Sequence, residues 1–254
     1  MELMTKRDRT AIFIFFIFLF ILGAPSAVFY SQGYRVDFNP PDGVLKIVQT
    51  GGFYFKVAPD HADIYINGKL TKGTSMLTNT AYIENLLPKN YDIEIKKDGY
   101  RPWKKTLEVK EREATEARNI ILFPENPQFI IMNQAPPKIT VSATSTDKKK
   151  TVESSEYEIS ATFLEKDGPI GQQGEKIFLT RFSEKIGDIF WLNDYYLIFN
   201  VGNKIKISEI DGRDGLNIID LAEFENPEVI WDKNAKKLYI VSEKKTYLLE
   251  NLLP

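Results

Sequence analysis

The sequence has no cysteine and a single histidine, His61, among 254 residues. Without cysteine there are no disulfide bonds, thiolate-bound metals or cysteine nucleophiles, and a serine triad or histidine-rich zinc site would depend on one imidazole. A formal net charge of −2, from 33 basic and 35 acidic side chains, supplies no positive field for phosphate backbones. Glycine-rich phosphate loops and nucleophile elbows are also absent. We therefore expect no nucleic-acid binding, no metal, no cofactor and no catalytic residues.

A run of 20 uncharged residues, 11–30, lies near the N-terminus, and its first twelve residues are all apolar. A helix rises about 1.5 Å per residue, so this run spans the roughly 30 Å of membrane hydrocarbon. Three cations precede it within residues 1–10, and only Arg35 and Lys46 follow it closely. Because positive flanks stay inside, we predict a single-pass helix in the cell membrane, a cytoplasmic N-terminus and an extracytoplasmic segment 31–254.

A cleaved signal peptide is the alternative, since the apolar block also fits a signal sequence and Ala24-Pro25-Ser26-Ala27 contains small residues typical of a cleavage site. Pro25 would occupy position −3 or −2 and would disturb the extended fit that cleavage requires. We expect the helix to be retained, and either alternative exports the rest of the chain.

A polar, turn-rich segment at 31–50 follows the apolar run, and we interpret it as a juxtamembrane spacer. Between residues 51 and 124 apolar and polar residues then alternate with a period of two, which is typical of half-buried strands. Asn67-Gly68 predicts a type I′ hairpin, because both residues tolerate positive φ. Six strands without helical pattern between them predict a small antiparallel β-sandwich. The six segments are 53–57, 63–67, 80–84, 91–96, 106–109 and 119–123.

The turn motifs of this stretch resemble those of the PEGA domain. They are Pro59-Asp60-His61-Ala62, Asn67-Gly68, Gly73-Thr74, Leu86-Leu87-Pro88 and Asp98-Gly99-Tyr100. The resemblance covers about residues 51–124 and implies an extracytoplasmic β-sandwich that packs against or binds other envelope components, with no established catalytic residues. The motif residues that it implies are structural: Pro59, Asp60, Ala62, Asn67, Gly68, Gly99 and Tyr100.

Three turns depart from the family pattern, and one of them has Thr74-Ser75 in place of the usual Thr-Pro. The glycine of the first motif is His61 here, and the Pro-Gly before the long strand is Pro88-Lys89-Asn90. Because asparagine tolerates the left-handed conformation, we expect Asn90 to replace that glycine without a change of fold.

An internal repeat follows a proline-containing linker at 125–138. Residues 188–191 resemble 228–231 at a spacing of 40, and 196–199 resemble 237–240 at a spacing of 41. A β repeat of this length is typical of propeller blades. A weaker unit starts near Ile139, and its turn at 145–150 resembles the Pro-Asp-Gly-Lys turns of the WD40-like (PD40) repeat.

At most three such units fit into 139–254, whereas propellers close with typically four to eight blades. The sequence therefore predicts a partial propeller with an unpaired sheet edge, which invites pairing with another chain. Three alternatives follow for this edge. The sandwich and spacer cover it, an envelope protein or a second copy completes it, or the chain is a truncated relative of a longer protein.

Some polar motifs have a simple structural interpretation. His61 lies in a turn beside Asp60, and one imidazole there predicts no metal site. Asp211-Gly212-Arg213-Asp214-Gly215 has the acidic character of a calcium loop, but Arg213 occupies a ligand position, so we predict a turn between strands. The run Asp147-Lys148-Lys149-Lys150 is predicted to be a solvated turn.

The fold class is therefore mainly β: a transmembrane helix, a PEGA-like sandwich and partial propeller blades. We expect a non-enzymatic, membrane-anchored envelope protein that acts as a structural or protein-interaction module. The alternative is a glycan- or cell-wall-binding module in which Tyr65, Tyr82 and Trp103 stack on sugar rings; Trp103 also fits a role in the sandwich core. An enzyme with a hidden carboxylate site is a third hypothesis.

Overall fold

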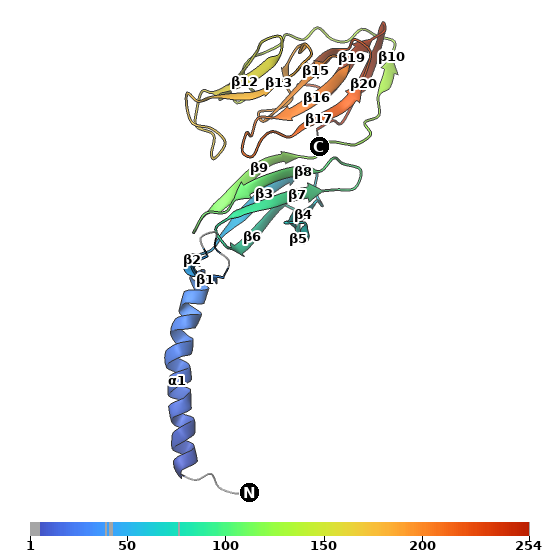
Figure 1. Cartoon of the computed structure of the whole chain (residues 1–254). Helices are drawn as coiled ribbons and strands as arrows, with labels where there is room; N and C mark the ends of the chain where they lie inside the picture. Colours follow the sequence, from blue (N-terminus) through green and yellow to red (C-terminus); the bar gives the residue numbers. More distant parts are fainter. Residues whose placement is uncertain (1–5, 39, 41–42, 76, 254) are drawn as a thin grey trace. The chain divides into compact units, whose positions relative to one another are not determined.

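The computed structural model describes residues 6–38, 40, 43–75 and 77–253. The chain is mainly β, with one long helix and small antiparallel sheets (Figure 1). Its contacts define two compact units. The first comprises residues 1–54, 82–90 and 108–115, and the second comprises residues 55–81, 91–107 and 116–254.

The first unit begins with helix α1 (Lys6–Ser31), which contains the predicted segment 11–30 and has no buried residue. Its length and apolar composition allow it to cross a membrane or to act as a signal sequence. The spacer that follows contains an unpredicted hairpin, in which β1 (Tyr34–Asp37) pairs antiparallel with β2 (Lys46–Gln49).

The predicted sandwich consists of two sheets, with strand orders β6-β3-β9 and β5-β4-β7-β8. The strands are β3 (Gly51–Ala58), β4 (Asp63–Ile66), β5 (Lys69–Gly73), β6 (Thr80–Leu86), β7 (Asn90–Lys96), β8 (Trp103–Glu108) and β9 (Ala114–Ile121). Inward residues such as Phe55, Ile64 and Ile95 are fully buried. The sequence predicted every strand except β5, whose five residues are all exposed and therefore show no apolar alternation.

The backbone geometry of the turns confirms one predicted hairpin and explains one departure from the family pattern. Asn67 and Gly68 have φ of 49° and 76°, which confirms the predicted hairpin between β4 and β5. His61, at the position of the family's glycine, is also left-handed, with φ of 54°. Asn90 does not take over a left-handed position as expected: it begins β7 and is not among the residues with positive φ, although the strand itself forms.

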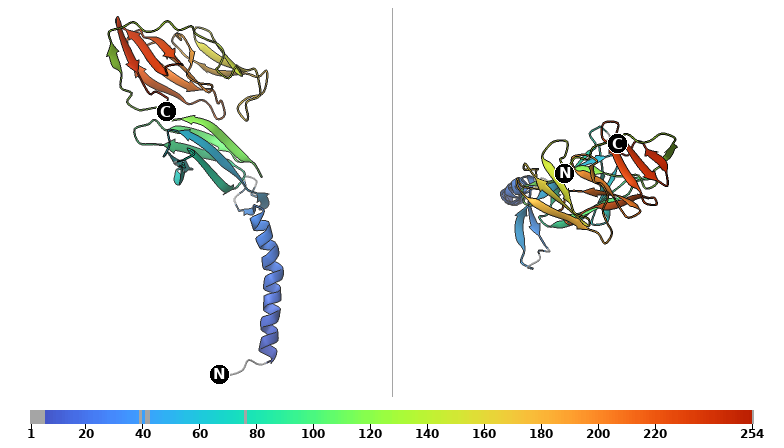
Figure 2. Two further views of the ribbon diagram at one scale, coloured as in Figure 1. Left: turned by 180° about the vertical axis from the view of Figure 1, so that it is seen from behind. Right: turned by 90° about the horizontal axis from the view of Figure 1, so that it is seen from above.

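Three small sheets make up the part of the second unit that follows the sandwich, with strand orders β11-β12-β13, β14-β15-β16-β17 and β10-β20-β19-β18. In Figure 2 the green β10 lies beside the red strands of the last sheet, as the pairing with β20 requires. The strands are β10 (Ile130–Met132), β11 (Lys150–Ser154), β12 (Glu158–Phe163), β13 (Lys176–Arg181), β14 (Phe190–Trp191), β15 (Tyr196–Val201), β16 (Lys204–Glu209), β17 (Ile218–Glu223), β18 (Glu228–Asp232), β19 (Lys237–Ser242) and β20 (Lys245–Leu249).

The internal repeat corresponds to strand position. Among the repeated strands, taken in chain order, β14 and β18 come first, β15 and β19 come second, and β16 and β20 come third. The fourth position is filled by β17 in one sheet and by β10 in the other. β10 lies inside the predicted linker, so part of residues 125–138 belongs to the last sheet.

Two buried clusters join neighbouring sheets. One contains residues of the first and second sheets, and the other contains residues of the second and third, with Trp191 and Trp231 in the respective clusters. Within the described part of the chain, neither cluster joins the first sheet to the third. Successive sheets packed in chain order are the arrangement expected of blades in an open array.

Candidate functional site

The motif around Asp60 fixes a turn. The Asp60 backbone carbonyl accepts a hydrogen bond from the Lys97 ammonium, and the His61 Nδ1 lies 3.1 Å from the Asp60 Oδ2. The hydrogen bond from His61 and the charge of Lys97 lower the pKa of Asp60. On the other side of the turn, the Ala62 N–H donates to the Thr74 hydroxyl at 3.0 Å. These contacts hold neighbouring turns together.

The second motif joins the turn at Gly99 to the end of the sandwich. Gly99 has φ of 79°, and its carbonyl accepts a hydrogen bond from the Glu125 N–H at 3.0 Å. Tyr100 forms an isolated antiparallel bridge with Pro124. Gly99 and Tyr100 therefore act through the backbone.

The three candidate ligand-contact aromatics do not form one platform. Tyr65, on β4, is half-buried, and the Lys96 ammonium lies over its ring, 4.9 Å from the ring centroid. Tyr82 lies on β6, in the other sheet, and is 46% exposed. Trp103 is only 4% exposed. Burial removes Trp103 from any sugar-stacking surface and supports its role in packing.

Trp103 instead lies at a buried junction between β8 and the loop after β16, both in the second unit. Its indole N–H donates to the Glu209 Oε2 at 3.0 Å, and Lys105 Nζ lies 2.7 Å from the Glu209 Oε1. The Lys105 side chain is 1% exposed. Its ammonium also donates to the carbonyls of Asp211, Arg213 and Gly215 at 2.6 to 2.7 Å. Because every donor of this buried lysine has a partner, the charge is compensated.

The loop after β16 also covers the outer edge of β8, the last strand of its sheet. The Asn217 side chain donates to the Lys104 carbonyl at 3.1 Å and accepts from the Lys104 N–H at 3.4 Å. The Thr106 N–H donates to the Asp214 carboxylate at 2.5 Å. Side chains thus replace the strand that would otherwise pair with this edge. The predicted turn at 211–215 is confirmed, and Arg213 is paired with Asp211 within it.

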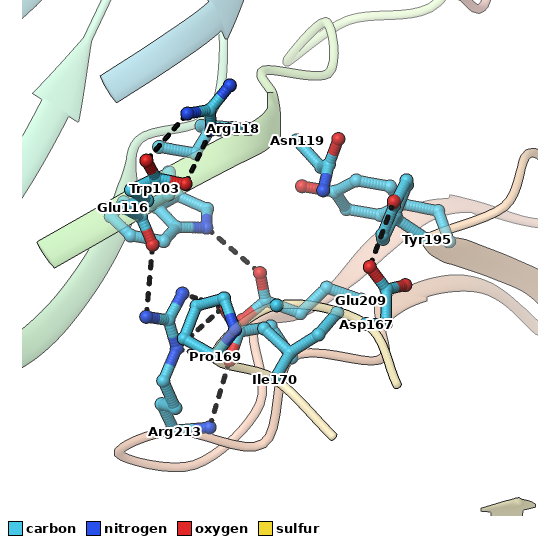
Figure 3. Close-up of a pocket in the computed structure, with 15 residues that line it drawn as sticks. Trp103, Glu116, Arg118, Asn119, Asp167, Pro169, Ile170, Tyr195, Glu209 and Arg213 are labelled. Atoms are coloured by element: carbon cyan, nitrogen blue, oxygen red, sulfur yellow. Dashed lines mark hydrogen bonds and ion pairs between the residues drawn. The ribbon is translucent and has the colours of Figure 1, made fainter. Parts of the chain in front are cut away.

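A cavity of about 150 Å³ lies beside this junction (Figure 3). Its walls come from β9, from the loop before β13 and from the ends of β15 and β16. The polar side chains that line it include Glu116, Arg118, Asn119, Asp167, Tyr195, Glu209 and Arg213.

The carboxylates of this cavity are already engaged. Glu209 Oε1 accepts hydrogen bonds from the Asn217 backbone and side chain, in addition to its contact with Lys105. Asp167 lies 2.6 Å from the Lys150 Nζ. Arg118 is paired with Glu116. No group of three or more histidine and acidic side chains suited to a metal ion occurs among the described residues.

Lys150 was predicted to be solvated, and this prediction is wrong. Its side chain is fully buried, between Asp147 at 3.0 Å and Asp167 at 2.6 Å, with the Tyr195 ring centroid 4.4 Å away. Burial alone would lower the pKa of Lys150, but hydrogen bonds to Asp167 and Asp147 outweigh it and raise the pKa. Burial raises the pKa of Tyr195.

The buried lysines left a weak signal in the sequence. Trp103, Lys105 and Leu107 alternate with exposed or half-buried residues, so Lys105 occupies a core-facing position of its strand. A charged residue at such a position indicates a buried ion pair, because an unpaired charge would be too costly there. The partner, Glu209, is distant in the sequence and had no comparable signal.

A groove of about 580 Å³ runs beside β13, the outer strand of the first sheet. Its apolar walls include Ile170, Ile177 and Phe178, with Glu175 and Arg213 as charged groups. Phe178 is 61% exposed, although it lies within a strand. The sequence analysis predicted an unpaired edge but did not locate it at β13.

Comparison with curated proteins finds no match to the chain. A family model of the PEGA domain matches residues 56–121, inside the predicted range of 51–124. The resemblance of residues 139–254 to the PD40 repeat stays a prediction. Residues 56–121 are therefore similar to the PEGA domain, and they include the turns with the Asp60 and Gly99 motifs.

Proposed function

We propose that the chain is a non-enzymatic, membrane-anchored protein of the cell envelope that binds another protein through the first of its three C-terminal sheets. Helix α1 supports anchoring, since it is long, apolar and unburied. The PEGA domain supports an extracytoplasmic location. The engaged carboxylates of the cavity support a binding role rather than catalysis.

The observation that carries this proposal is the unpaired outer edge of β13 in the first sheet. At the other edge of this sheet the segment around Thr144 already bridges Thr151 on β11, so β13 corresponds to β17 as the last strand of its sheet. No strand among the described residues pairs with the outer edge of β13. An extended segment added at this edge would continue the sheet by backbone pairing.

The groove indicates the chemistry of the added strand. Ile170, Ile177 and Phe178 offer an apolar surface next to the β13 backbone. Specificity in strand addition comes from alternate side chains of the added strand. We therefore expect the partner to supply an extended segment with alternating apolar residues, one of which covers Phe178.

Site-specific photocrosslinking in the native envelope tests this proposal. A photoreactive phenylalanine analogue at Phe178 should crosslink to an extended segment of one protein. The matched control carries the analogue at Leu70, which is 53% exposed on the PEGA strand β5 and should give no such product.

Hydrogen exchange then decides whether the contact is strand addition. A peptide copying the crosslinked segment should slow exchange at β13 amides, and the variant Phe178→Asp should abolish this protection. A crosslinked segment from this same chain would identify a second copy as the partner. Crosslinking without protection of β13, or no product above the control, would contradict the proposal.

Anchoring has a separate test. Protease added to intact spheroplasts should digest residues 31–254, and the mass of the membrane-extracted chain should include α1. Protection of the folded part would reverse the proposed topology, and loss of α1 would identify a cleaved signal.

A further inference from the structure

The hairpin β1–β2 exposes more large apolar side chains than a short surface hairpin needs. The exposed fractions are 42% for Val36, 79% for Phe38, 62% for Val44, 63% for Leu45 and 73% for Ile47. Isolated two-stranded hairpins are marginally stable in water, and contiguous exposed apolar surface indicates an interaction site.

The strand register sorts these residues onto one face. Val36 lies opposite Ile47 in the antiparallel pair, so both side chains are on the same side of the hairpin. Arg35 and Lys46 alternate with them and therefore lie on the other side. The hairpin is thus amphipathic, with an apolar face that continues to Phe38 and Leu45 beyond the strands.

Several contacts fix the hairpin to the end of α1. The helix ends at Ser31 and β1 begins at Tyr34, and the Thr50 N–H donates to the Gly33 carbonyl at 2.9 Å. The Arg35 guanidinium donates to the Tyr30 carbonyl at 2.8 Å and lies 3.5 Å from the centroid of the Tyr30 ring. Tyr34 packs edge-on against Phe29, with 5.5 Å between ring centroids. The hairpin therefore cannot move far from the last turn of the helix.

We propose that the apolar face of this hairpin lies in the headgroup and upper acyl region of the outer leaflet. The inference rests on the proposed anchoring of α1, since a helix that ends at the membrane surface places an attached hairpin there. Tyrosine and arginine at the helix end are residues that favour this interface. Lipid is the nearest apolar phase for Phe38, Leu45 and Ile47. The predicted spacer then acts as a second membrane contact rather than as a means of distance.

Spin labelling tests the proposal on the full chain. Because the sequence contains no cysteine, single substitutions Phe38→Cys and Ile47→Cys can be labelled without background. The protein is reconstituted in nanodiscs of phosphatidylcholine and phosphatidylglycerol, and power saturation compares collisions with oxygen, which partitions into lipid, and with a water-soluble nickel complex. We expect oxygen to dominate at both sites.

Two matched sites make the outcomes distinguishable. Lys46→Cys, next to Ile47 on the opposite face, should favour the nickel complex, and Phe18→Cys in the middle of α1 should favour oxygen. If the labels at 38 and 47 collide mainly with the nickel complex while the label at 18 collides mainly with oxygen, the hairpin proposal is overturned but the anchoring of α1 stands. A water-exposed label at 18 would overturn both. Low accessibility to both reagents at 38 and 47 would indicate burial against protein and would also overturn the proposal.

Discussion

The charge of Lys105 depends on the fold, because its ammonium is enclosed by Glu209 and three backbone carbonyls. Lys105→Met leaves the Glu209 carboxylate buried without its counter-charge. Removing one partner of a buried ion pair costs about 3–5 kcal/mol. Urea unfolding should show this loss, whereas Lys104→Met, at a neighbouring exposed position, should change the free energy of unfolding by less than about 1 kcal/mol. Equal losses in the two variants would contradict a special role of the buried lysine.

Asp147 and Lys150 predict the pH dependence of the first C-terminal sheet. Burial opposes ionisation of Asp147, but hydrogen bonds from Ser145, Lys149 and Lys150 lower its pKa below the ordinary 3.8. A lowered pKa means that the stability contributed by Asp147 is present above pH 3.8 and is lost as the pH falls through the folded value. Lys150, whose pKa is raised above 10.5, contributes fully below pH 10.5 and loses its contribution as the pH rises through the folded value.

Between pH 3.8 and pH 10.5 these two groups should therefore cause no change in the free energy of unfolding. Asp147→Asn should make the acid-side loss of stability shallower, measured as the free energy of urea unfolding against pH. An unchanged acid slope in the variant would be evidence against the contribution of Asp147.

Trp191 and Trp231 occupy equivalent repeat positions but differ in one hydrogen bond. The Trp191 Nε1 donates to the Ala143 carbonyl at 2.8 Å, whereas the buried Trp231 Nε1 has no partner among the described residues. Substitution by phenylalanine removes the same volume at both positions. Trp191→Phe should therefore cost about 1 kcal/mol more than Trp231→Phe, since it also loses a hydrogen bond. A larger loss for Trp231→Phe in chemical denaturation would be the opposite of this expectation.

At the scale of elements, the covered edge of β8 gives the clearest prediction. Asn217→Ala removes both contacts to the Lys104 backbone, and Asp214→Ala removes the acceptor of the Thr106 N–H. Amide exchange at Lys104 and Thr106 should accelerate in the respective variants, because these groups then face solvent. Exchange at Ile93 on the adjacent inner strand β7 should stay slow and serves as the internal control. Unaltered exchange at β8 would mean that other groups protect the edge.

The elements that could be predicted from the sequence are those with their own local signal. α1 follows from an unbroken apolar run, and β3, β4 and β7 follow from alternation that matches one buried face. β5 lacked that signal because it buries nothing, and β10 was assigned to a linker because its sheet is completed by strands far along the chain. The groove beside β13 could not be located, since an unpaired edge is a property of tertiary neighbours.

At the scale of the whole molecule, the Lys105 junction predicts how the chain unfolds. It links β8 of the PEGA sandwich to the loop after β16 through buried contacts within one compact unit. Thermal unfolding of the detergent-solubilised chain should show one transition for this unit, followed by tryptophan fluorescence. In Lys105→Met the loss of coupling should separate the sandwich from the C-terminal sheets into two transitions. Two transitions in the unaltered chain would show that the sandwich and sheets are independent.

The position of β10 also determines when the last sheet can be completed. β10 precedes all other strands of the three C-terminal sheets, yet it pairs with β20, at the opposite end of this part of the chain. As the polypeptide is synthesised, β10 must therefore wait for the final strand before it can pair. During that interval Ile130 and Ile131 lie on an unpaired apolar segment, which is prone to aggregation. The sheet that is synthesised last is thus also the sheet that is completed last.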